Sequence, residues 1–161
     1  MLSVDIFKTF IEYHIDMSRR VWDSIDQITE EKFLADDAYS RGSIRNLMVH
    51  LANTDLNWLA GLKNIPEEQD PAQKKFEDYL NRPSVRALWD ATAKDITDYA
   101  QTLTEAELGE NPMDISNPRW QVLLHIINHG TDHRSTVLQR LYELGAPTFD
   151  QDFIIWLDSR K

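Results

Sequence analysis

The stretch Trp120-Gln-Val-Leu-Leu-His125-Ile-Ile-Asn-His129-Gly-Thr-Asp-His133-Arg134 decides the fold of this chain more than any other. Its apolar residues recur at intervals of three and four, which is the period of an amphipathic helix. The pattern begins near Arg119 and continues to Leu144, and Gly145 and Pro147 then supply a stop signal. The sequence therefore predicts a long helix over about 119–144.

Three earlier segments show the same period, over about 3–28, 43–62 and 84–103. Ser3 and Ser43 stand where an N-cap is expected, because a serine oxygen can accept from the free N–H groups of a first helical turn. Four long amphipathic helices with few β-type runs favour a bundle that buries each apolar stripe against the others. We therefore predict an all-α fold, a four-helix bundle.

The segments between these helices are polar or contain helix breakers. Residues 29–41 are acidic and lack a clear period, 66–71 form a polar break, and 109–118 hold two prolines and two asparagines. A short helix within 73–80 is an open alternative. The C-terminal tail is too apolar to be free, and we expect a short segment of it to pack on the bundle through Phe153, Ile154, Trp156 and Leu157.

Composition limits both the architecture and the partners. With 161 residues, 42% of them apolar, the chain can bury one sizeable core and is expected to form a single domain over 1–161. Its formal net charge of -10 argues against nucleic-acid partners and against docking on anionic lipid. No apolar run approaches the roughly 18 residues of a membrane span, so we expect no membrane partner.

The chain contains no Cys, which excludes disulfides, thiolate metal sites and cysteine nucleophiles. The N-terminal residues lack the basic start and apolar run of a signal peptide, so a cytoplasmic location is the default expectation.

Candidate metal ligands stand in the stretch quoted first. His125, His129 and His133 follow at i, i+4 and i+8, close to one stripe of the helix, so a neighbouring pair can ligate one ion. A third ligand must come from another helix, and His50 and His14 are the two candidates, since both share a side with apolar residues. Imidazole suits Zn, Ni, Fe and Cu alike.

The glycine that directly follows His129 is also informative. Gly130 follows His129 where a zincin-type protease has its glutamate base, so that chemistry is absent. Glycine in a helix interior costs roughly 1 kcal/mol relative to alanine. Its presence suggests close packing or room for a ligand.

The quoted stretch resembles the last bundle helix of the DinB/YfiT-like family, in which a Leu-Leu-His run precedes Asn-His-x-x-x-His-Arg. Residues 43–58, with His50, resemble that family's His-bearing second helix, and the order of the motifs fits over nearly the whole chain. The resemblance implies a four-helix bundle with a three-His metal site, here His50, His129 and His133. It implies that His125 is not a ligand, so we expect His125 either to support the ligands or to be structural, and we expect a structural role for His14.

The chain departs from this family pattern at one corner. Many members continue His-Arg-Gly-Gln, whereas His133 and Arg134 are followed here by Ser135 and Thr136, and Asp132 replaces a frequent histidine. Substrate choice or activity is therefore expected to differ from that of such members.

Three neutral imidazoles leave coordination positions open, which is the arrangement of catalytic rather than structural metal sites. We expect a divalent ion, Zn or Ni first and Fe as a further option, that supports thiol transfer or hydrolysis of a small molecule. A non-catalytic, metal-stapled binding or structural protein is the main alternative, and a metal-free bundle is a third.

Other side chains are expected around the metal. The residues that can hold the free imidazole nitrogens are His125, Asn53, Asp55, Asn128 and Asp132. Arg134 is expected either to steer an anionic substrate or to form a surface salt bridge. A homodimer is a further expectation, because amphipathic bundles often bury a spare apolar face and because relatives frequently pair.

Overall fold

Four long helices form the body of the protein in a computed structural model that describes residues 3–36, 41–66 and 75–161. They are α1 (Val4–Ile25), α3 (Ile44–Leu62), α4 (Arg82–Thr102) and α6 (Arg119–Glu143). Shorter elements are α2 (Glu30–Leu34), the 3-10 helix η2 (Phe76–Asp78), α5 (Glu105–Leu108) and α7 (Phe153–Asp158). The described ranges contain no strand, so the predicted all-α fold is confirmed.

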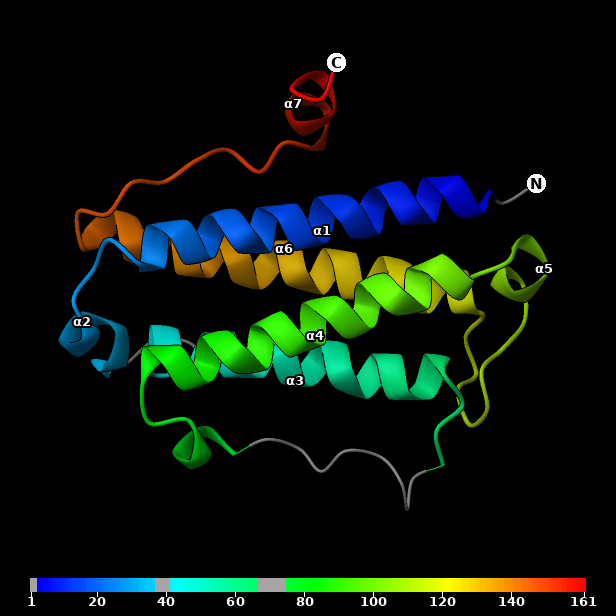
Figure 1. The fold of residues 1–161 in the computed structure, drawn as a ribbon, viewed down its shortest axis with the longest axis horizontal. Helices are drawn as coiled ribbons and strands as arrows, with labels where there is room; N and C mark the ends of the chain where they lie inside the picture. Colours follow the sequence, from blue (N-terminus) through cyan, green and yellow to red (C-terminus); the bar gives the residue numbers. More distant parts are fainter. Residues whose placement is uncertain (1–2, 37–40, 67–74) are drawn as a thin grey trace.

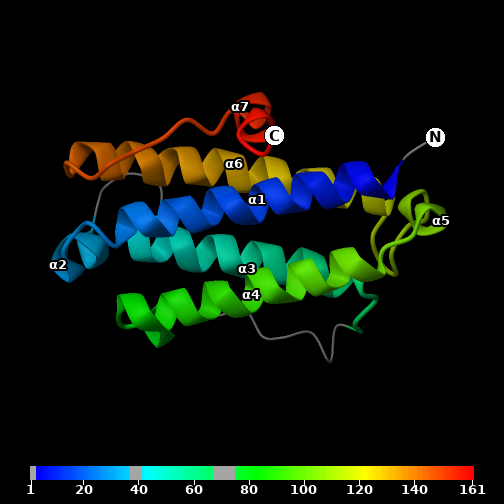
Figure 2. The ribbon, with the colours of Figure 1, turned by 45° about the horizontal axis from the view of Figure 1, so that its top comes forward.

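The four long helices pack as a closed ring. Helix α1 contacts α6 and α4, and α3 contacts the same two helices from the other side. Helices α1 and α6 run in one direction while α3 and α4 run in the other, so the end of α3 and the start of α4 lie at opposite ends of the bundle (Figures 1 and 2). This arrangement places the middle of α6 beside the first half of α3, with antiparallel directions.

Side-chain caps set where two of these helices begin. Ser43 accepts a hydrogen bond from the Asn46 N–H at 3.1 Å, as its N-cap position predicts. Asn81 and Ser84 form a reciprocal capping box at the start of α4. Ser3 also occupies an N-cap position, but its side chain makes no capping hydrogen bond.

The predicted connections contain more helix than their sequences indicated. Residues 29–41 include α2, whose first turn is capped by the Thr29 hydroxyl. One and a half turns are too short to show an apolar period, so this helix was missed. Of the alternative helix within 73–80, the described residues form only the turn η2, and most of the break at 66–71 lies outside the described residues.

A continuous apolar core fills the ring. Trp22 is completely buried and its ring packs against Phe33 and Trp89, with centroids 6.2 and 6.3 Å away. Burying a side chain of this size contributes on the order of 3 kcal/mol relative to leaving it in water. The aromatic side chains of α1, α2 and α4 therefore hold the end of the bundle to which α2 belongs.

The tail packs on α1, as expected, through one face of α7. Trp156 is buried and its indole N–H donates to Asp16 Oδ2 at 2.9 Å, while Phe153 contacts the Tyr13 ring edge-on. Leu157 is partly buried against the same cluster. Ile154 was expected to pack as well, but it is 64% exposed because a single short helix can bury only one of its faces.

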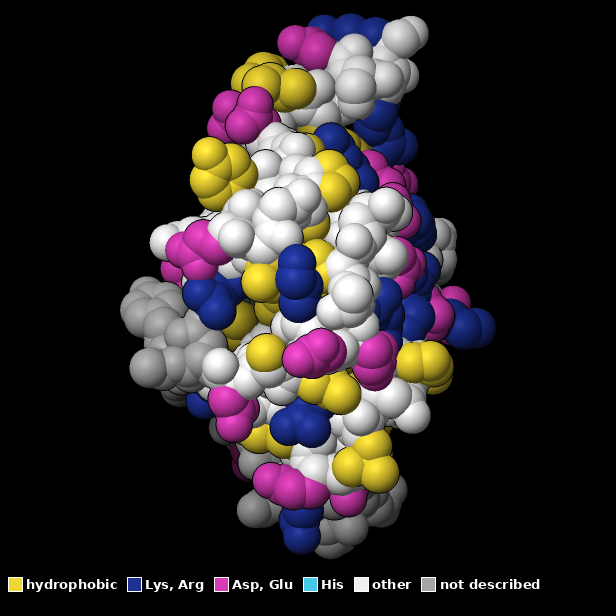
Figure 3. All heavy atoms as spheres, turned by 90° about the vertical axis from the view of Figure 1, so that its left-hand side faces the viewer, with side chains coloured by type: hydrophobic (Ala, Val, Ile, Leu, Met, Phe, Trp, Pro, Cys, Tyr) yellow, Lys and Arg dark blue, Asp and Glu magenta, His cyan; other side chains and the backbone are white. Residues whose placement is uncertain are grey.

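The surface is charged and mixed in sign. On the face that Figure 3 shows, Lys and Arg side chains are interspersed with Asp and Glu rather than gathered into a patch of one sign. Within the described ranges, no helix combines the length and the apolar character needed to cross a membrane.

Candidate metal centre

Three half-buried histidines from two neighbouring helices converge where α3 packs against α6. His50 comes from α3, and His129 and His133 come from successive turns of α6. One ligand atom from each lies within 4.8 Å of the other two. The ring centroids are 4.4 Å apart for the α6 pair, and 5.2 and 4.8 Å from His50 to His129 and His133. The antiparallel packing of α3 against α6 thus brings together residues about 80 positions apart in the chain.

The spacing of these nitrogens suits a metal ion after a small movement. Two nitrogens bound to one tetrahedral ion at about 2.1 Å lie about 3.4 Å apart. Small rotations of the imidazole rings would bring the three nitrogens, now within 4.8 Å of one another, to that spacing. His129 supports this assignment, because its buried Nδ1 has no hydrogen-bond partner among the described residues. A buried polar atom without a partner is uncommon, and a bound cation would satisfy this one.

Burial keeps the three imidazoles neutral. The pKa of His50 and of His129 is lowered to about 4, chiefly by desolvation and in smaller part by the neighbouring histidines. Desolvation likewise lowers the pKa of His133, although Asp132 opposes this. Because a metal ligand must present an unprotonated nitrogen, the site is ready for a cation at neutral pH without losing protons first.

Arg41 lies against the outer side of the triad. Its Nη2 donates to His50 Nε2 at 3.3 Å, and its charge lowers the pKa of both His50 and His133. Sequence reasoning did not single out Arg41, because it stands in a connection two residues before the Ser43 cap and carries no periodic signal. Only the folded chain shows that this arginine faces the histidines.

The residues expected to surround the metal divide into two groups. His125, Asn128 and Asp132 are exposed on α6, and the His125 ring packs between Trp58 and His129, with centroids 4.9 and 5.7 Å away. Asn53 and Asp55 are buried on α3. The buried pair is therefore better placed to support the triad from within the bundle.

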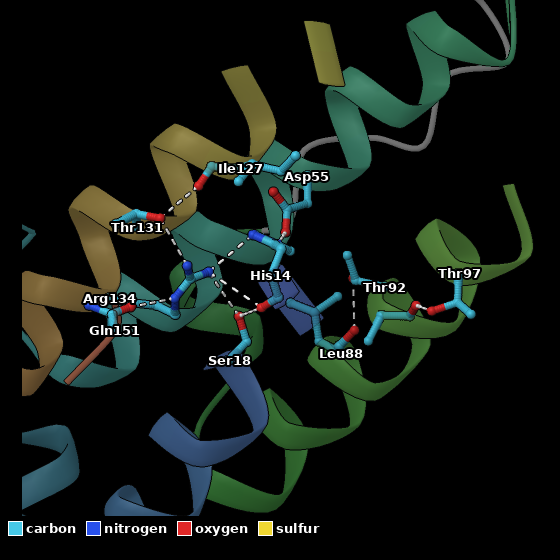
Figure 4. A network of polar contacts seen from close by, with 11 residues as sticks. His14, Ser18, Asp55, Leu88, Thr92, Thr97, Ile127, Thr131, Arg134 and Gln151 are labelled. Atoms are coloured by element: carbon cyan, nitrogen blue, oxygen red, sulfur yellow. Dashed lines mark hydrogen bonds and ion pairs between the residues drawn. The ribbon is translucent and has the colours of Figure 1, made fainter. Parts of the chain in front are cut away.

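Asp55 belongs to a buried polar network that links α3, α1 and α6 (Figure 4). Its Oδ2 lies 3.1 Å from His14 Nε2, and His14 Nδ1 lies 3.0 Å from Arg134 Nη1. Since a guanidinium can only donate, His14 accepts at Nδ1 and donates from Nε2 to the carboxylate. His14, the rival third ligand in the sequence, is thus committed to this network and is not one of the three converging histidines.

Arg134 lies where neither of its expected roles is possible. It is completely buried, and it donates to Gln151 Oε1 at 2.7 Å and to the Thr131 and Ser18 hydroxyls. Burial lowers the pKa of Arg134 to about 10, which leaves it charged at neutral pH. The expectations of a substrate contact and of a surface salt bridge are both wrong, because the side chain points back into the bundle towards α1.

Close packing explains the glycine in the middle of α6. A Cβ atom at Gly130 would lie 2.4 Å from His14 Cε1 and 2.8 Å from Arg134 Nη1. The absence of a side chain therefore lets the His14 ring lie directly on α6, beside the metal triad. Of the two readings of Gly130, the structure supports close packing.

The corner that departs from the family pattern is completed by the tail. Gln151 bonds Arg134 and also donates to Ser135 Oγ at 3.1 Å, while the Thr136 hydroxyl donates to the Asp132 carbonyl oxygen of its own helix. A glutamine side chain thus reaches this corner from residue 151 instead of residue 136.

Two hollows lie along α3, and one of them reaches His50. A hollow of about 400 Å³ is lined by His50, Arg41, Lys75 and Glu77, and a second of about 490 Å³ includes Trp58. Thr54, one helical turn after His50, lines both. A small molecule therefore has space next to the triad.

Comparison with known proteins agrees with this architecture. The model of the DinB family matches residues 2–159, which is nearly the whole chain. The chain belongs to the DinB family. A curated DinB family protein, Protein DinB of Bacillus subtilis (strain 168), is 22% identical over 176 aligned residues, which cover 96% of this chain and 95% of that protein.

Proposed function

We propose that this DinB family protein is a metal-dependent enzyme in which His50, His129 and His133 hold one divalent ion. Zn and Ni are the first candidates and Fe is a further one, because three imidazoles accept all of them. The observation that carries the proposal is the convergence of three neutral histidines beside a hollow of about 400 Å³. A structural site would be closed by a fourth protein ligand.

The chemistry of the site follows from its charges. A divalent ion at three neutral imidazoles supplies Lewis acidity, which lowers the pKa of a water or thiol group that reaches its open position. The triad contributes no negative charge, so the full positive charge of the ion is available to such a group. Asp55, buried nearby, raises the pKa of both His50 and His129, and its Oδ1 has no hydrogen-bond partner among the described residues. The role of Asp55 is to stabilise positive charge at the imidazoles from the buried side of the site.

Two reaction classes fit this site, and we place thiol transfer ahead of hydrolysis. The chain has no Cys, so the thiol must arrive as a second substrate. In the transfer, the thiol sulfur forms a bond to an electrophilic carbon, the leaving group departs with its electron pair, and the thiol proton passes to water. In hydrolysis, water takes the place of the thiol.

Metal content and turnover together test the proposal. Protein purified without a His tag should contain one equivalent of metal by elemental analysis, and His129→Ala should lose it. Turnover should then appear in a panel of small thiols with alkylating electrophiles, or with esters and amides if the reaction is hydrolysis. Metal-free protein from a metal-replete preparation would contradict the proposal, as would full metal binding by the alanine variant.

The alternative of a metal-stapled, non-catalytic protein has its own support, because the triad joins α3 to α6 and an ion there would link two helices. The two functions differ in whether a small molecule binds at the open coordination position of the ion. If chelation lowers the melting temperature sharply while no thiol or other small ligand perturbs the spectrum of the bound metal, stapling is correct and the enzyme proposal is wrong.

A further inference from the structure

The hollow beside His50 has a charge that is unusual for this chain. Arg41 and Lys75 line it, with Glu77 as the one carboxylate among its lining residues. The chain as a whole carries a formal net charge of -10, whereas the charged side chains that line this hollow are two cations and one carboxylate. Within the described residues, no carboxylate forms an ion pair with either Arg41 or Lys75.

The backbone holds Arg41 at the rim of this hollow. Asn46 Nδ2 donates to the Arg41 carbonyl oxygen at 2.8 Å, and the Asn46 N–H is itself bonded to the Ser43 cap. The main chain at Arg41 is therefore tied to the first turn of α3. Its side chain is exposed and reaches His50, which lies two turns further along the same helix.

The hydrogen bond from Arg41 to His50 Nε2 and metal binding at the same nitrogen exclude each other. The lone pair of His50 Nε2 can accept from Arg41 or bind a cation, but it cannot do both. A metal bound through that nitrogen releases the guanidinium, which then presents its donors to the hollow. The released cation lies next to a divalent ion whose three protein ligands are neutral, so a negative group between them is favoured.

We infer that Arg41 and Lys75 form a subsite for an acidic group, a carboxylate or a phosphate, on the substrate that reaches the metal. The inference rests on the proposed function, because the subsite adjoins the open position of that ion. The planar guanidinium matches the two oxygens of such a group, and the Lys75 ammonium adds a point charge. The subsite takes one of the two roles that the sequence left open for Arg134, which is contact with an anionic substrate.

Thiols of different charge test the subsite by binding rather than by turnover. The protein is loaded with Co²⁺ and titrated with 3-mercaptopropionate, which carries a carboxylate, and with neutral 2-mercaptoethanol. The sulfur-to-cobalt absorption band reports each Kd. The ratio of the two Kd values is compared among the wild type, Arg41→Gln, Lys75→Gln, the double variant and Arg19→Gln, a control on the α1 surface.

The wild type should prefer the acidic thiol, and the double variant should lose about three- to tenfold of that preference, the range expected for two partly exposed ion pairs. Binding of 2-mercaptoethanol should change by less than about twofold, and Arg19→Gln should leave the ratio unchanged. An unchanged ratio in the double variant would overturn the subsite alone. Absence of the band with both thiols, although Co²⁺ is bound, would instead contradict thiol transfer in the proposed function and the subsite that rests on it.

Discussion

Arg134 and Asp55 compensate each other's charge across the ring of His14, to which both are hydrogen-bonded. All three side chains are buried, so water contributes little to their stabilisation. The network therefore stabilises the bundle only while it is complete, because removing one charge leaves the other without compensation in a medium of low dielectric.

Arg134→Met tests this dependence. We expect the free energy of unfolding to fall by about 3–5 kcal/mol, because Asp55 then remains buried without its compensating cation. Urea unfolding followed by circular dichroism measures it. The control Arg19→Met removes an exposed ion pair with Asp16 and should cost less than about 1 kcal/mol. A loss below about 1 kcal/mol at Arg134 would show that the network contributes no more than a surface pair.

The site also depends on the missing side chain at residue 130. Gly130→Ala gains roughly 1 kcal/mol of helix propensity, but its Cβ would lie 2.4 Å from His14 Cε1. Displacing a ring held by two hydrogen bonds costs typically 1–3 kcal/mol, so we expect no net stabilisation and a weakened metal site. Gly109→Ala, at the C-cap of α5, is the control for a substitution without a clash, because nothing lies within 4 Å of a Cβ there. If Gly130→Ala raises the melting temperature and leaves metal affinity unchanged, His14 can move freely and its packing is unimportant.

The sequence predicted the bundle well because its signals are local. The apolar period, the Ser43 cap and the stop at Gly145 each depend on neighbours within a few residues, so the bounds of α3 and α6 agree with expectation. Only the family resemblance predicted the convergence of His50 with His129 and His133, because no local rule places residue 50 against residue 129. The homodimer and the cytoplasmic location stay predictions.

The roles of single arginines could not be predicted in the same way. Arg134 follows the proposed metal ligand His133 in sequence, yet the next step around a helix turns it by about 100° and into the core. Arg41 has no such sequence neighbour and reaches the site because its carbonyl oxygen is hydrogen-bonded to Asn46 in the first turn of α3. Which arginine meets solvent depends on the packing of whole helices, which a single sequence does not display.

Acid should destabilise the metal-free protein in a defined window. The pKa of His50 and of His129 is lowered from 6.5 to about 4 in the folded state. The unfolded chain therefore binds more protons between these values, so stability present above pH 6.5 is lost as the pH falls towards 4. Urea unfolding in the presence of a chelator, at steps between pH 7 and pH 4.5, measures the slope. The variant His50→Gln should flatten it, and an equal slope in that variant would assign the effect to other groups.

Removal of Arg41 should strengthen metal binding even though it weakens binding of an acidic substrate. The guanidinium donates to His50 Nε2 and repels any cation at the triad, so Arg41→Gln removes both a competitor and a like charge. Because Arg41 is exposed and screened by salt, we expect a modest gain in Co²⁺ affinity, about two- to fivefold at low ionic strength and less at high salt. Competition with a chromophoric chelator measures it, with Arg19→Gln as the reference for a distant arginine. A weaker Co²⁺ affinity in Arg41→Gln would mean that Arg41 holds His50 in its ligating orientation, because loss of that support would then outweigh the relief of repulsion.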